Sequence, residues 1–593
     1  MRFYRHNSRV KKDSRQTASG PRNTRFGLLY AGFLLAALVL AFRLFMLQVV
    51  SHSFYEALAS NAHEIFSKLT PERGSIFLRD QDGKLYPAAA NRDTFVIFAE
   101  PRAVKQPEEL ADLLAPMLVL EREELLKKLT SGGWYAPLAR GVPEDLANQI
   151  SDLLKEKNLK GIRESRESAR YYPEPAMGGQ VIGFVGSNEK GERSGRYGLE
   201  GYWNKELAGS QGFIAAETDI AGRWIPAAGR TIAPAANGAE LVLTVDRTVQ
   251  FTACQKLKDA VSTHGADSGS LVILEPATGD LLAMCSAPDF DPNNYSAVSD
   301  FSIFNNPAIS GQYEPGSVMK AITMAAALDR DQVTPKSTYT DTGEVKLGPF
   351  TIKNSDGKAH GVQTMTQVLE ESLNTGAIYA QRLIGTETFR GYLEKFGFGE
   401  ATGIELAGES DGDIAALKKK GEIFGATASY GQGITVTPLQ LAAAFGAVAN
   451  GGNFVAPTII SEIRWSETNV ERRQPKIARQ VISPKTAAML GGMLVAVVEN
   501  GHGKRAGVPG YWVAGKTGTA QVPKKDGPGY LADVTIGTFT GFFPVENPKF
   551  AMVVRIDHPR DVQFAESTAA PLFGEIAKFL LQYYHIPPTR PVK

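Results

Sequence analysis

The first long hydrophobic run of the chain, Phe26–Phe42, is uncharged. A basic segment, residues 1–25, precedes it with Asp13 as its one acidic residue, and Arg43 and the apolar Leu44–Val50 follow it. At about 1.5 Å per residue in a helix, the uncharged run nearly spans a bilayer. The pattern predicts a transmembrane anchor, with the basic tail in the cytoplasm and the rest of the chain outside.

A cleaved signal peptide and a buried core helix are the two competing interpretations of this run. The small-residue site at Ala57–Ala59 lies well past the apolar core, which argues against cleavage. We therefore expect a cytoplasmic tail over residues 1–25 and an uncleaved anchor over residues 26–50. No second apolar run of spanning length follows, so the remaining chain is predicted to be an extracytoplasmic body.

The next stretch has mixed helical and strand periodicity and predicts a first module over residues 51–232. A helix is expected to continue from the anchor to about residue 70, where Thr70-Pro71 ends it. A strand and turn follow over residues 73–83, and apolar residues recur at helical spacing over 107–129 and 143–156. Nothing in this module suggests catalysis.

A second module, residues 233–593, opens after the linker-like Arg230–Gly238. Its first elements are predicted to be a strand at Leu241–Val245, a helix at Arg247–His264, and a hairpin that pairs 269–274 with 280–284.

Alanine-rich helices fill the middle of this module, as at Thr437–Ala449, and strands return late in the chain. We expect strands at 510–522, 535–543 and 550–556 and a final helix at 569–584. Helices enclosed between early and late strands predict an α+β domain whose antiparallel sheet joins both ends of the module.

Composition narrows the function classes. The 593 residues, 43% hydrophobic, allow two or more domains, and a formal charge of +1 offers no global field for nucleic acid. Cys254 and Cys285 could form a disulfide, but we favour two buried thiols because one lies in a helical pattern and the other in a strand pattern. No metal cluster is apparent, and no cofactor is expected.

Ser317 and Lys320 are the first candidates for chemistry. Pro315-Gly316 ends the preceding segment and a helix-forming run follows, so Ser317 should lie at a helix N-terminus. Lys320 lies one turn later on the same face, and a neutral lysine can take the proton of an attacking serine. Alone, this Ser-x-x-Lys pattern often arises by chance.

Two further motifs strengthen the assignment. Ser372-Leu-Asn374 can direct both polar side chains into one site only from a turn or irregular segment. Lys516-Thr517-Gly518-Thr519 is embedded in β-prone residues, where Gly518 would let a substrate backbone approach closely. The overlapping stretch 510–517 matches the sequence pattern of a phosphate-binding loop. Its interior residues, Tyr-Trp-Val-Ala, are bulky and the residues that follow are strand-like, which argues against nucleotide binding.

The order Ser-x-x-Lys, Ser-x-Asn, Lys-Thr-Gly resembles the motif set of the penicillin-recognising serine enzymes. Nearly the whole chain resembles a class B penicillin-binding protein, a monofunctional peptidoglycan D,D-transpeptidase. That resemblance implies an elongated, non-catalytic pedestal (dimerisation-like) domain and a serine β-lactamase-like transpeptidase domain. It rests on the basic tail, the anchor and these stretches: Arg73–Ile76, Arg170–Pro173, Gly198–Glu200, Tyr313–Ser317 and Val513–Gln521.

The resemblance implies acyl transfer on stem peptides that end in D-Ala-D-Ala. Ser317 would attack, with Lys320 as the proton acceptor, while Ser372 would relay a proton to the leaving D-alanine. The remaining roles implied are peptide holding by Asn374, repulsion by Lys516 that keeps Lys320 neutral, carboxylate binding by Lys516, Thr517 and Thr519, and oxyanion stabilisation by the N–H groups of Ser317 and Thr519.

The sequences of two stretches, Ala514–Gln521 and Ser429–Pro438, resemble the division-specific branch of that family more than the elongation branch. The implied partners are stem peptides, β-lactams, the inner membrane, a membrane glycosyltransferase and other division proteins. A β-lactamase, a D,D-carboxypeptidase or β-lactam sensor, and a non-catalytic scaffold remain as alternatives. No loop glutamate with the spacing of a lactamase base is apparent.

Overall fold

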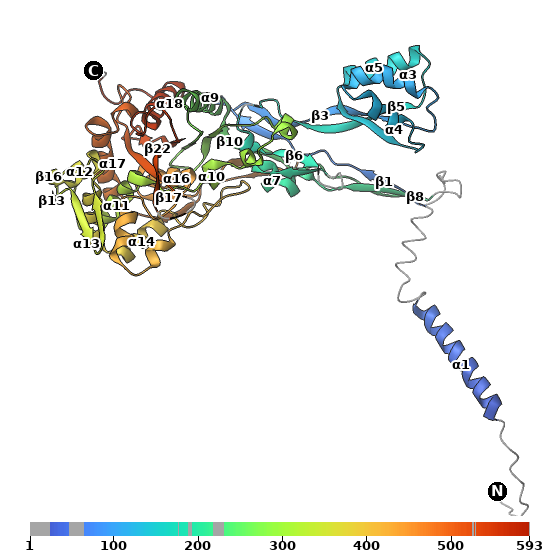
Figure 1. The fold of residues 1–593 in the computed structure, drawn as a ribbon, viewed down its shortest axis with the longest axis horizontal. Coiled ribbons are helices and arrows are strands. Elements are labelled where there is room, and N and C mark those ends of the chain that lie inside the picture. The colour runs from blue at the N-terminus through green and yellow to red at the C-terminus, as the bar shows by residue number, and fades with distance from the viewer. Residues whose placement is uncertain are drawn as a thin grey trace, which may run out of the picture. The chain divides into compact units, whose positions relative to one another are not determined.

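The computed structural model describes residues 24–46, 64–175, 177–187, 193–217, 230–524, 527 and 529–591 (Figure 1). The chain divides into two compact units. One comprises Met1–Thr70 with Gln211–Ala235, and the other comprises Pro71–Ser210 with Ala236–Lys593.

The smaller unit contains helix α1 (Thr24–Phe45) and an antiparallel sheet of β1 (Glu64–Leu69), β8 (Gly212–Glu217) and β9 (Arg230–Ala233). Among the described residues, no helix meets both the length and the apolarity needed to cross a membrane. The predicted helix that continues to residue 70 is wrong over 64–69, because these residues pair with β8 as β1. Residues 51–63 lie outside the described part. The predicted linker also begins with strand β9.

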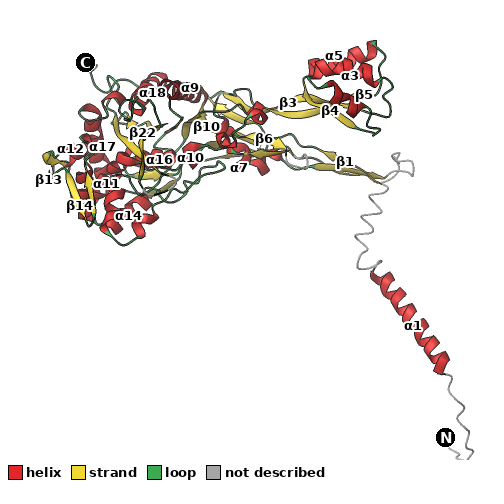
Figure 2. Cartoon of the chain, viewed as in Figure 1, coloured by secondary structure: helices red, strands yellow, loops and turns green. Residues whose placement is uncertain are grey.

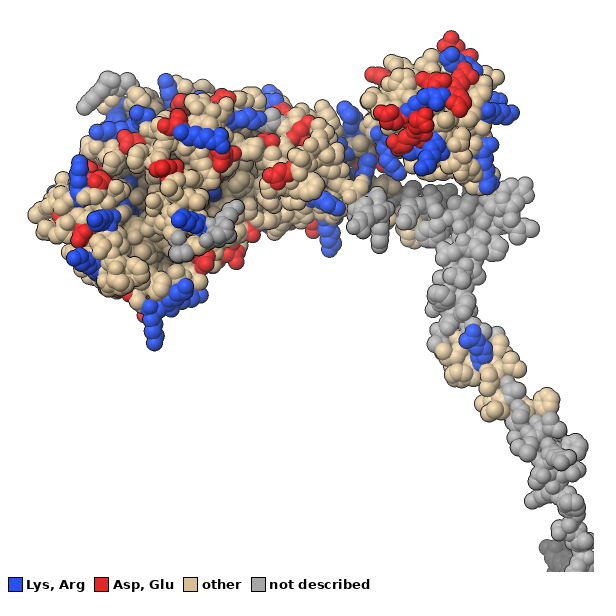
Figure 3. Space-filling model, viewed as in Figure 1, with Lys and Arg blue, Asp and Glu red and all other residues tan. Residues whose placement is uncertain are grey.

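Three helices and three strands of the larger unit enclose a separate hydrophobic core. Helices α3 (Pro107–Leu118), α4 (Arg122–Leu129) and α5 (Glu144–Glu156) pack on β3 (Leu85–Ala99), β4 (Ala136–Val142) and β5 (Ile162–Tyr171). The helical pattern over 107–129 is two helices, because Val119 takes a left-handed conformation with φ 53°. Acidic and basic side chains are interspersed over this part of the chain (Figure 3). Arg122 of α4 forms ion pairs with both Glu108 and Asp112.

A second sheet joins strands from both predicted modules. Its order is β19-β18-β10-β2-β3-β4, with β5 also paired to β3, and β10 lies parallel to β2. The strands that complete it are β2 (Ile76–Arg79), β10 (Glu240–Asp246), β18 (Ile460–Arg464) and β19 (Val470–Arg472). The predicted module boundary at residue 232 stays a prediction.

A buried ionic cluster links Arg73, near the start of the larger unit, with Arg170 and Glu200. Glu200 is fully buried and accepts hydrogen bonds from Arg73 Nε at 2.7 Å and Arg170 Nε at 2.6 Å. Because a buried carboxylate is costly unless it is paired, the two arginines stabilise this position. The short elements around it are α6 (Gly179–Ile182), β6 (Phe184–Ser187), β7 (Arg193–Arg196), α7 (Gly198–Tyr202) and α8 (Asn204–Ala208).

The sheet that carries the candidate site is antiparallel, with the order β12-β11-β23-β22-β21. Its strands are β11 (Ser268–Leu274), β12 (Leu281–Ala287), β21 (Ala514–Pro523), β22 (Tyr530–Phe543) and β23 (Phe550–Asp557). Helices α9 (Arg247–Thr263) and α18 (Ala569–Tyr583) cover one face of this sheet and share a hydrophobic core with it (Figure 1). Helix α16 (Pro438–Ala449) also packs on the sheet and belongs to a second hydrophobic core. The prediction that early and late strands share one antiparallel sheet is confirmed.

Helix α11 (Met319–Asp329) follows the candidate nucleophile and contacts the longer helices of this region (Figure 2). The longer helices are α12 (Met365–Glu370), α13 (Asn374–Ile384), α14 (Thr386–Lys395), α15 (Glu422–Ser429) and α17 (Pro484–Glu499). The short helices are η2 (Pro292–Ala297), η3 (Phe301–Phe304), α10 (Pro307–Ser310), η4 (Gly316–Val318), η5 (Ala415–Lys418) and η6 (Lys504–Ala506). The small hairpins pair β13 (Thr338–Asp341) with β16 (Gly361–Thr364), β14 (Glu344–Leu347) with β15 (Phe350–Lys353), and β17 (Asn453–Val455) with β20 (Ile477–Gln480).

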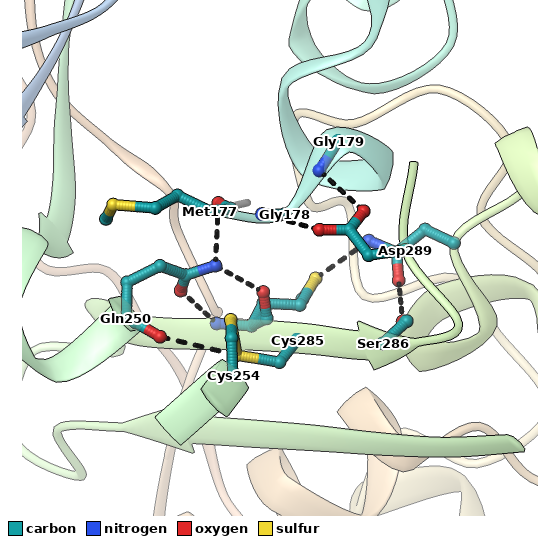
Figure 4. Close-up of a disulfide and its surroundings, with 10 residues drawn as sticks. Met177, Gly178, Gly179, Gln250, Cys254, Cys285, Ser286 and Asp289 are labelled. Carbon is teal, nitrogen blue, oxygen red and sulfur yellow. Dashed lines mark hydrogen bonds between the residues drawn. A yellow bond between two sulfur atoms is a disulfide. The ribbon is translucent and has the colours of Figure 1, made fainter. Parts of the chain in front are cut away.

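Cys254 of α9 and Cys285 of β12 form a disulfide, which corrects the expectation of two buried thiols (Figure 4). Helix α9 lies on β12, so the two side chains meet although their local patterns differ. Gln250, one turn before Cys254, completes this contact: its amide nitrogen donates to Met284 O at 2.7 Å, and its amide oxygen accepts from Met284 N–H at 2.9 Å.

Replacing both cysteines with alanine is expected to lower the free energy of unfolding. The bridge closes a loop with a sequence separation of 31, for which the chain-entropy model gives about 3–4 kcal/mol. Denaturant unfolding of the native and variant chains, each with and without a thiol reductant, measures the effect. Reductant should destabilise the native chain alone, and equal sensitivity of the two chains would contradict the prediction.

Candidate active site

Ser317 lies in η4, a 3-10 helix of one turn immediately before α11, and therefore at the helix N-terminus that the sequence predicts. Two features of the backbone hold this turn. Tyr313 and Val436 exchange N–H to O hydrogen bonds of 3.1 and 3.0 Å, and Gly316 N–H donates to Gly431 O at 3.1 Å. Gly316 has φ 57°, a conformation that glycine adopts without strain. The chain before the serine is therefore fixed against the 431–436 segment.

Lys320 is buried, with 1% of its surface exposed, and its amine is directed at Ser372. Lys320 Nζ donates to Ser372 O at 2.5 Å and to Ser372 Oγ at 3.2 Å. The hydroxyl of Ser317 has no hydrogen-bond partner among the residues that the structure describes. Ser317 and Lys320 are thus one helical turn apart without a direct bond, and the Ser317 hydroxyl bonds none of the described residues.

Ser372 connects the two lysines. It lies between α12 and α13 with φ 55°, which agrees with the irregular segment predicted for this motif. Lys516 Nζ, from edge strand β21, donates to Ser372 Oγ at 3.0 Å. One hydroxyl therefore lies within hydrogen-bond distance of both amines, as a proton relay requires.

Both lysines favour the neutral form more than an exposed lysine does. Burial lowers the pKa of Lys320 well below its usual value, and the nearby Lys516 lowers it further. Burial lowers the pKa of Lys516 to about 7. Burial is thus the first cause of a neutral Lys320, and repulsion by Lys516, which the resemblance implied, is the second.

The remaining predicted residues lie around this centre. Thr517 Oγ1 is 3.4 Å from Lys516 Nζ, because the long lysine side chain turns back along its own strand. Thr519 Oγ1 accepts a hydrogen bond from Ala565 N–H at 3.1 Å. The Asn374 amide donates to Lys353 O at 2.8 Å and forms no described hydrogen bond with Lys320, Ser372 or Lys516.

Gly518 allows β21 to pack on the nucleophile turn. A Cβ at this position would lie 2.7 Å from both Pro315 O and Val318 Cγ2. The sequence predicted that this glycine admits a substrate backbone. In the structure the close neighbour is the turn that carries Ser317, and the glycine sets the distance between the strand and that turn. Substrate approach at Gly518 stays a prediction.

Replacing Gly518 with alanine is expected to slow acylation by a penicillin about tenfold or more, because the added methyl group must push the strand or the turn aside. About 1.4 kcal/mol of misplacement is sufficient for a tenfold change. Gly492, where a Cβ would meet nothing within 4 Å, offers the control variant Gly492→Ala. Equal acylation rates for the two variants would contradict the prediction.

Two further groups near the nucleophile turn were not assigned from the sequence. Arg555 lies over the Tyr313 ring at 4.2 Å and donates to Gly311 O at 2.8 Å, so it supports the segment before Ser317. Glu314 accepts hydrogen bonds from Gly433 N–H at 2.8 Å and Tyr530 O–H at 3.0 Å. Glu314 lies three residues before Ser317, and this sequence proximity is the signal that could have indicated it as a site residue.

Comparison with known proteins defines the class to which this fold and site belong. The penicillin binding protein transpeptidase domain matches residues 269–578, and the penicillin-binding protein dimerisation domain matches residues 68–243. The chain belongs to the penicillin-binding protein transpeptidase family. The predicted α+β architecture of a pedestal domain followed by a transpeptidase domain is thereby confirmed.

Named relatives are similar along most of the chain. Stage V sporulation protein D of Bacillus subtilis is 34% identical over 547 residues, which cover 90% of this chain and 82% of that protein. Peptidoglycan D,D-transpeptidase FtsI of Escherichia coli K12 is 30% identical over 573 residues, covering 95% and 92%. Among solved structures, penicillin binding protein 3 of Mycobacterium tuberculosis complexed with aztreonam has a TM-score of 0.67 and 27% identity, covering 89% of this chain and 99% of that one.

Proposed function

We propose that this chain is a serine-type peptidoglycan D,D-transpeptidase that cross-links stem peptides through an acyl-serine intermediate. One observation carries the proposal: the buried amines of Lys320 and Lys516 both donate hydrogen bonds to the Ser372 hydroxyl. Lys320 itself lies one helical turn after Ser317. Buried amines with lowered pKa values suit proton transfer near neutral pH. The names of the relatives, which include peptidoglycan D,D-transpeptidases, support this class of reaction.

In the acylation step, Ser317 Oγ attacks the carbonyl carbon between two D-alanines and transfers its proton to neutral Lys320. Ser372 then relays a proton to the nitrogen of the leaving D-alanine as the C–N bond breaks. The N–H groups of Ser317 and Thr519 stabilise the oxyanion. The same attack on a β-lactam carbonyl would open the ring and acylate Ser317, and the leaving group retained in the adduct would block the enzyme.

The substrate would lie along the free edge of β21. Lys516 in its charged form, Thr517 and Thr519 would receive the terminal carboxylate, and Gly518 would keep the strand close to the nucleophile turn. Asn374 would hold the peptide after releasing its bond to Lys353 O. An amine from a neighbouring strand then attacks the acyl carbon and restores Ser317.

We further propose a single-pass inner-membrane location, with the anchor at residues 26–50, a pedestal at 51–232 and a transpeptidase domain at 233–593 outside the cytoplasm. The uncharged run and basic tail support the anchor, and the Cys254–Cys285 disulfide suits an oxidising compartment. The similarity to FtsI supports septal wall synthesis beside a membrane glycosyltransferase and other division proteins.

The reaction is tested by supplying the full chain with a donor peptide ending in D-Ala-D-Ala and an amine acceptor. The expected products are one D-alanine and one new amide for each donor consumed. D-alanine release with only the hydrolysed peptide would instead identify a carboxypeptidase. Rapid turnover of a penicilloyl adduct would identify a lactamase, and no reaction with either substrate would leave a scaffold.

The septal role is tested separately with a fluorescent fusion of the full chain. Signal at mid-cell during division is the expected result. Signal along the side wall would overturn the division role and favour an elongation-type transpeptidase, without affecting the assignment of the reaction.

A further inference from the structure

Glu314, three residues before Ser317 in the chain, is a partly buried carboxylate that the acylation step does not use. Both of its oxygens are held by neutral donors: Gly433 N–H binds Oε1 at 2.8 Å, and the Tyr530 hydroxyl binds Oε2 at 3.0 Å. Within the described residues, Glu314 forms no ion pair with a lysine, arginine or histidine. Its position is therefore fixed while its negative charge is left without a cation.

The backbone places this carboxylate at the turn that carries Ser317. Glu314 is three residues before the serine, and Pro315-Gly316 turns the chain between them. Gly431 packs against Gly316 so closely that a Cβ on it would lie 2.1 Å from Gly316 O. The 431–433 segment therefore holds the turn through Gly316 and holds the Glu314 side chain through Gly433.

The second half of the reaction requires a group that the lysine cluster does not supply. An aliphatic acceptor amine is protonated near neutral pH, and it must lose that proton before it can attack. Lys320 is neutral again after acylation, because Ser372 passes the serine proton on to the leaving D-alanine, and it can then carry only the one proton that returns to Ser317 Oγ. An ammonium group must lose two protons to form the amide, and Lys516 in its charged form would repel it. A fixed carboxylate without a cation attracts it.

We propose that the Glu314 carboxylate binds the protonated acceptor amine and removes its proton, which makes Glu314 the general base of the transfer step. The inference rests on the proposed transpeptidase function and specifies the acceptor as a primary amine that arrives as a cation. Gly433 and Tyr530 act as positioning residues, because they orient the two carboxylate oxygens.

The protons balance as follows. The ammonium group gives one proton to Glu314, and the neutral amine attacks the acyl carbon, so that a C–N bond forms and the bond between carbon and Ser317 Oγ breaks. The second proton of the nitrogen returns to Ser317 Oγ through Lys320, and Glu314 releases its proton to water. Burial raises the pKa of the Glu314 carboxyl, which strengthens the carboxylate as a base, and Tyr430 and Tyr530 are the titratable neighbours.

The test uses the full chain with Glu314→Gln, which keeps the shape and a hydrogen-bond acceptor but removes the base. A thioester analogue of the donor peptide forms the acyl-enzyme, which is then partitioned between two acceptors: a basic primary amine, and hydroxylamine, which is neutral near pH 7. The expected result is a loss of about 10²-fold in transfer to the basic amine and a much smaller loss with hydroxylamine. The ratio of the two rates is the readout.

The exposed Glu467 offers the matched control, Glu467→Gln, which should leave the ratio unchanged. Acylation of each variant by a fluorescent penicillin shows whether the site is folded. Equal losses with penicillin, the basic amine and hydroxylamine would make Glu314 a structural residue and overturn the proposal. Failure of the native chain to form any acyl-enzyme would instead overturn the proposed function.

Discussion

Replacing Ser317 with alanine is expected to abolish covalent labelling by a fluorescent penicillin. The alanine leaves the turn unchanged, since the Ser317 hydroxyl bonds no described residue, but it removes the oxygen that forms the ester. No other group at the site replaces it, because the Lys320 and Lys516 amines and the Ser372 hydroxyl bond one another. In-gel fluorescence of the full chain over a range of penicillin concentrations measures the loss.

The control for this variant is Ser302→Ala, which removes an exposed hydroxyl upstream of the same turn. It should be labelled like the native chain. Unchanged labelling of the Ser317 variant would show that another residue is acylated. The roles given to Lys320 and Ser372 would then have no reaction to serve.

Replacing Lys320 with methionine is expected to slow penicillin acylation about 10²- to 10⁴-fold, the usual contribution of a general base. Methionine has a similar length and suits a position with 1% exposure, so the chain should still fold. Lys485, whose side chain is 76% exposed, provides the matched variant Lys485→Met. Stopped-flow measurement of the acylation rate distinguishes the two, and a loss below about tenfold would contradict a base at Lys320.

The acylation rate should also depend on pH through both amines. Burial disfavours the protonated form of each, so Lys320 is neutral, as a base must be, at pH values well below those of an exposed lysine. Lys516 has a pKa of about 7 and loses its charge above that value, which weakens its hold on the carboxylate of a penicillin. We expect acylation at low penicillin concentration to decline above about pH 7. A rate that keeps rising to pH 9 would contradict the role of Lys516.

Hydrophobic patterning predicted the elements of the transpeptidase sheet well, because each is long and strongly periodic. The helix at 247–264 and the strands at 535–543 and 550–556 agree with α9, β22 and β23 within a few residues. It failed where the structure depends on distant residues. Residues 64–69 form a strand because β8 pairs with them, and that partner begins at Gly212, far along the chain.

The two other failures have one local and one tertiary cause. The left-handed conformation of Val119 divides one predicted helix into two, and nothing in the residue type indicates it. The pairing of Cys254 with Cys285 depends on α9 lying over β12, which two local patterns cannot reveal.

For the candidate site, motif order identified Ser317, Lys320, Ser372 and Lys516, and the structure brings the last three together. The direction of the side chains could not be read from spacing. Lys320 bonds Ser372, and Asn374 bonds Lys353, because the turn at Ser372 and the hairpin of β15 decide where those groups lie. Glu314 received no role because its hydrogen-bond donors, Gly433 and Tyr530, are distant in the sequence and approach it only in the folded chain.

The most direct test of an acyl-serine enzyme at this site is peptide mapping of the full chain after reaction with penicillin. Protease digestion and mass spectrometry should place one penicilloyl group on the peptide that contains Ser317, at its hydroxyl. An adduct on any other residue, or no adduct at saturating penicillin, would contradict the account.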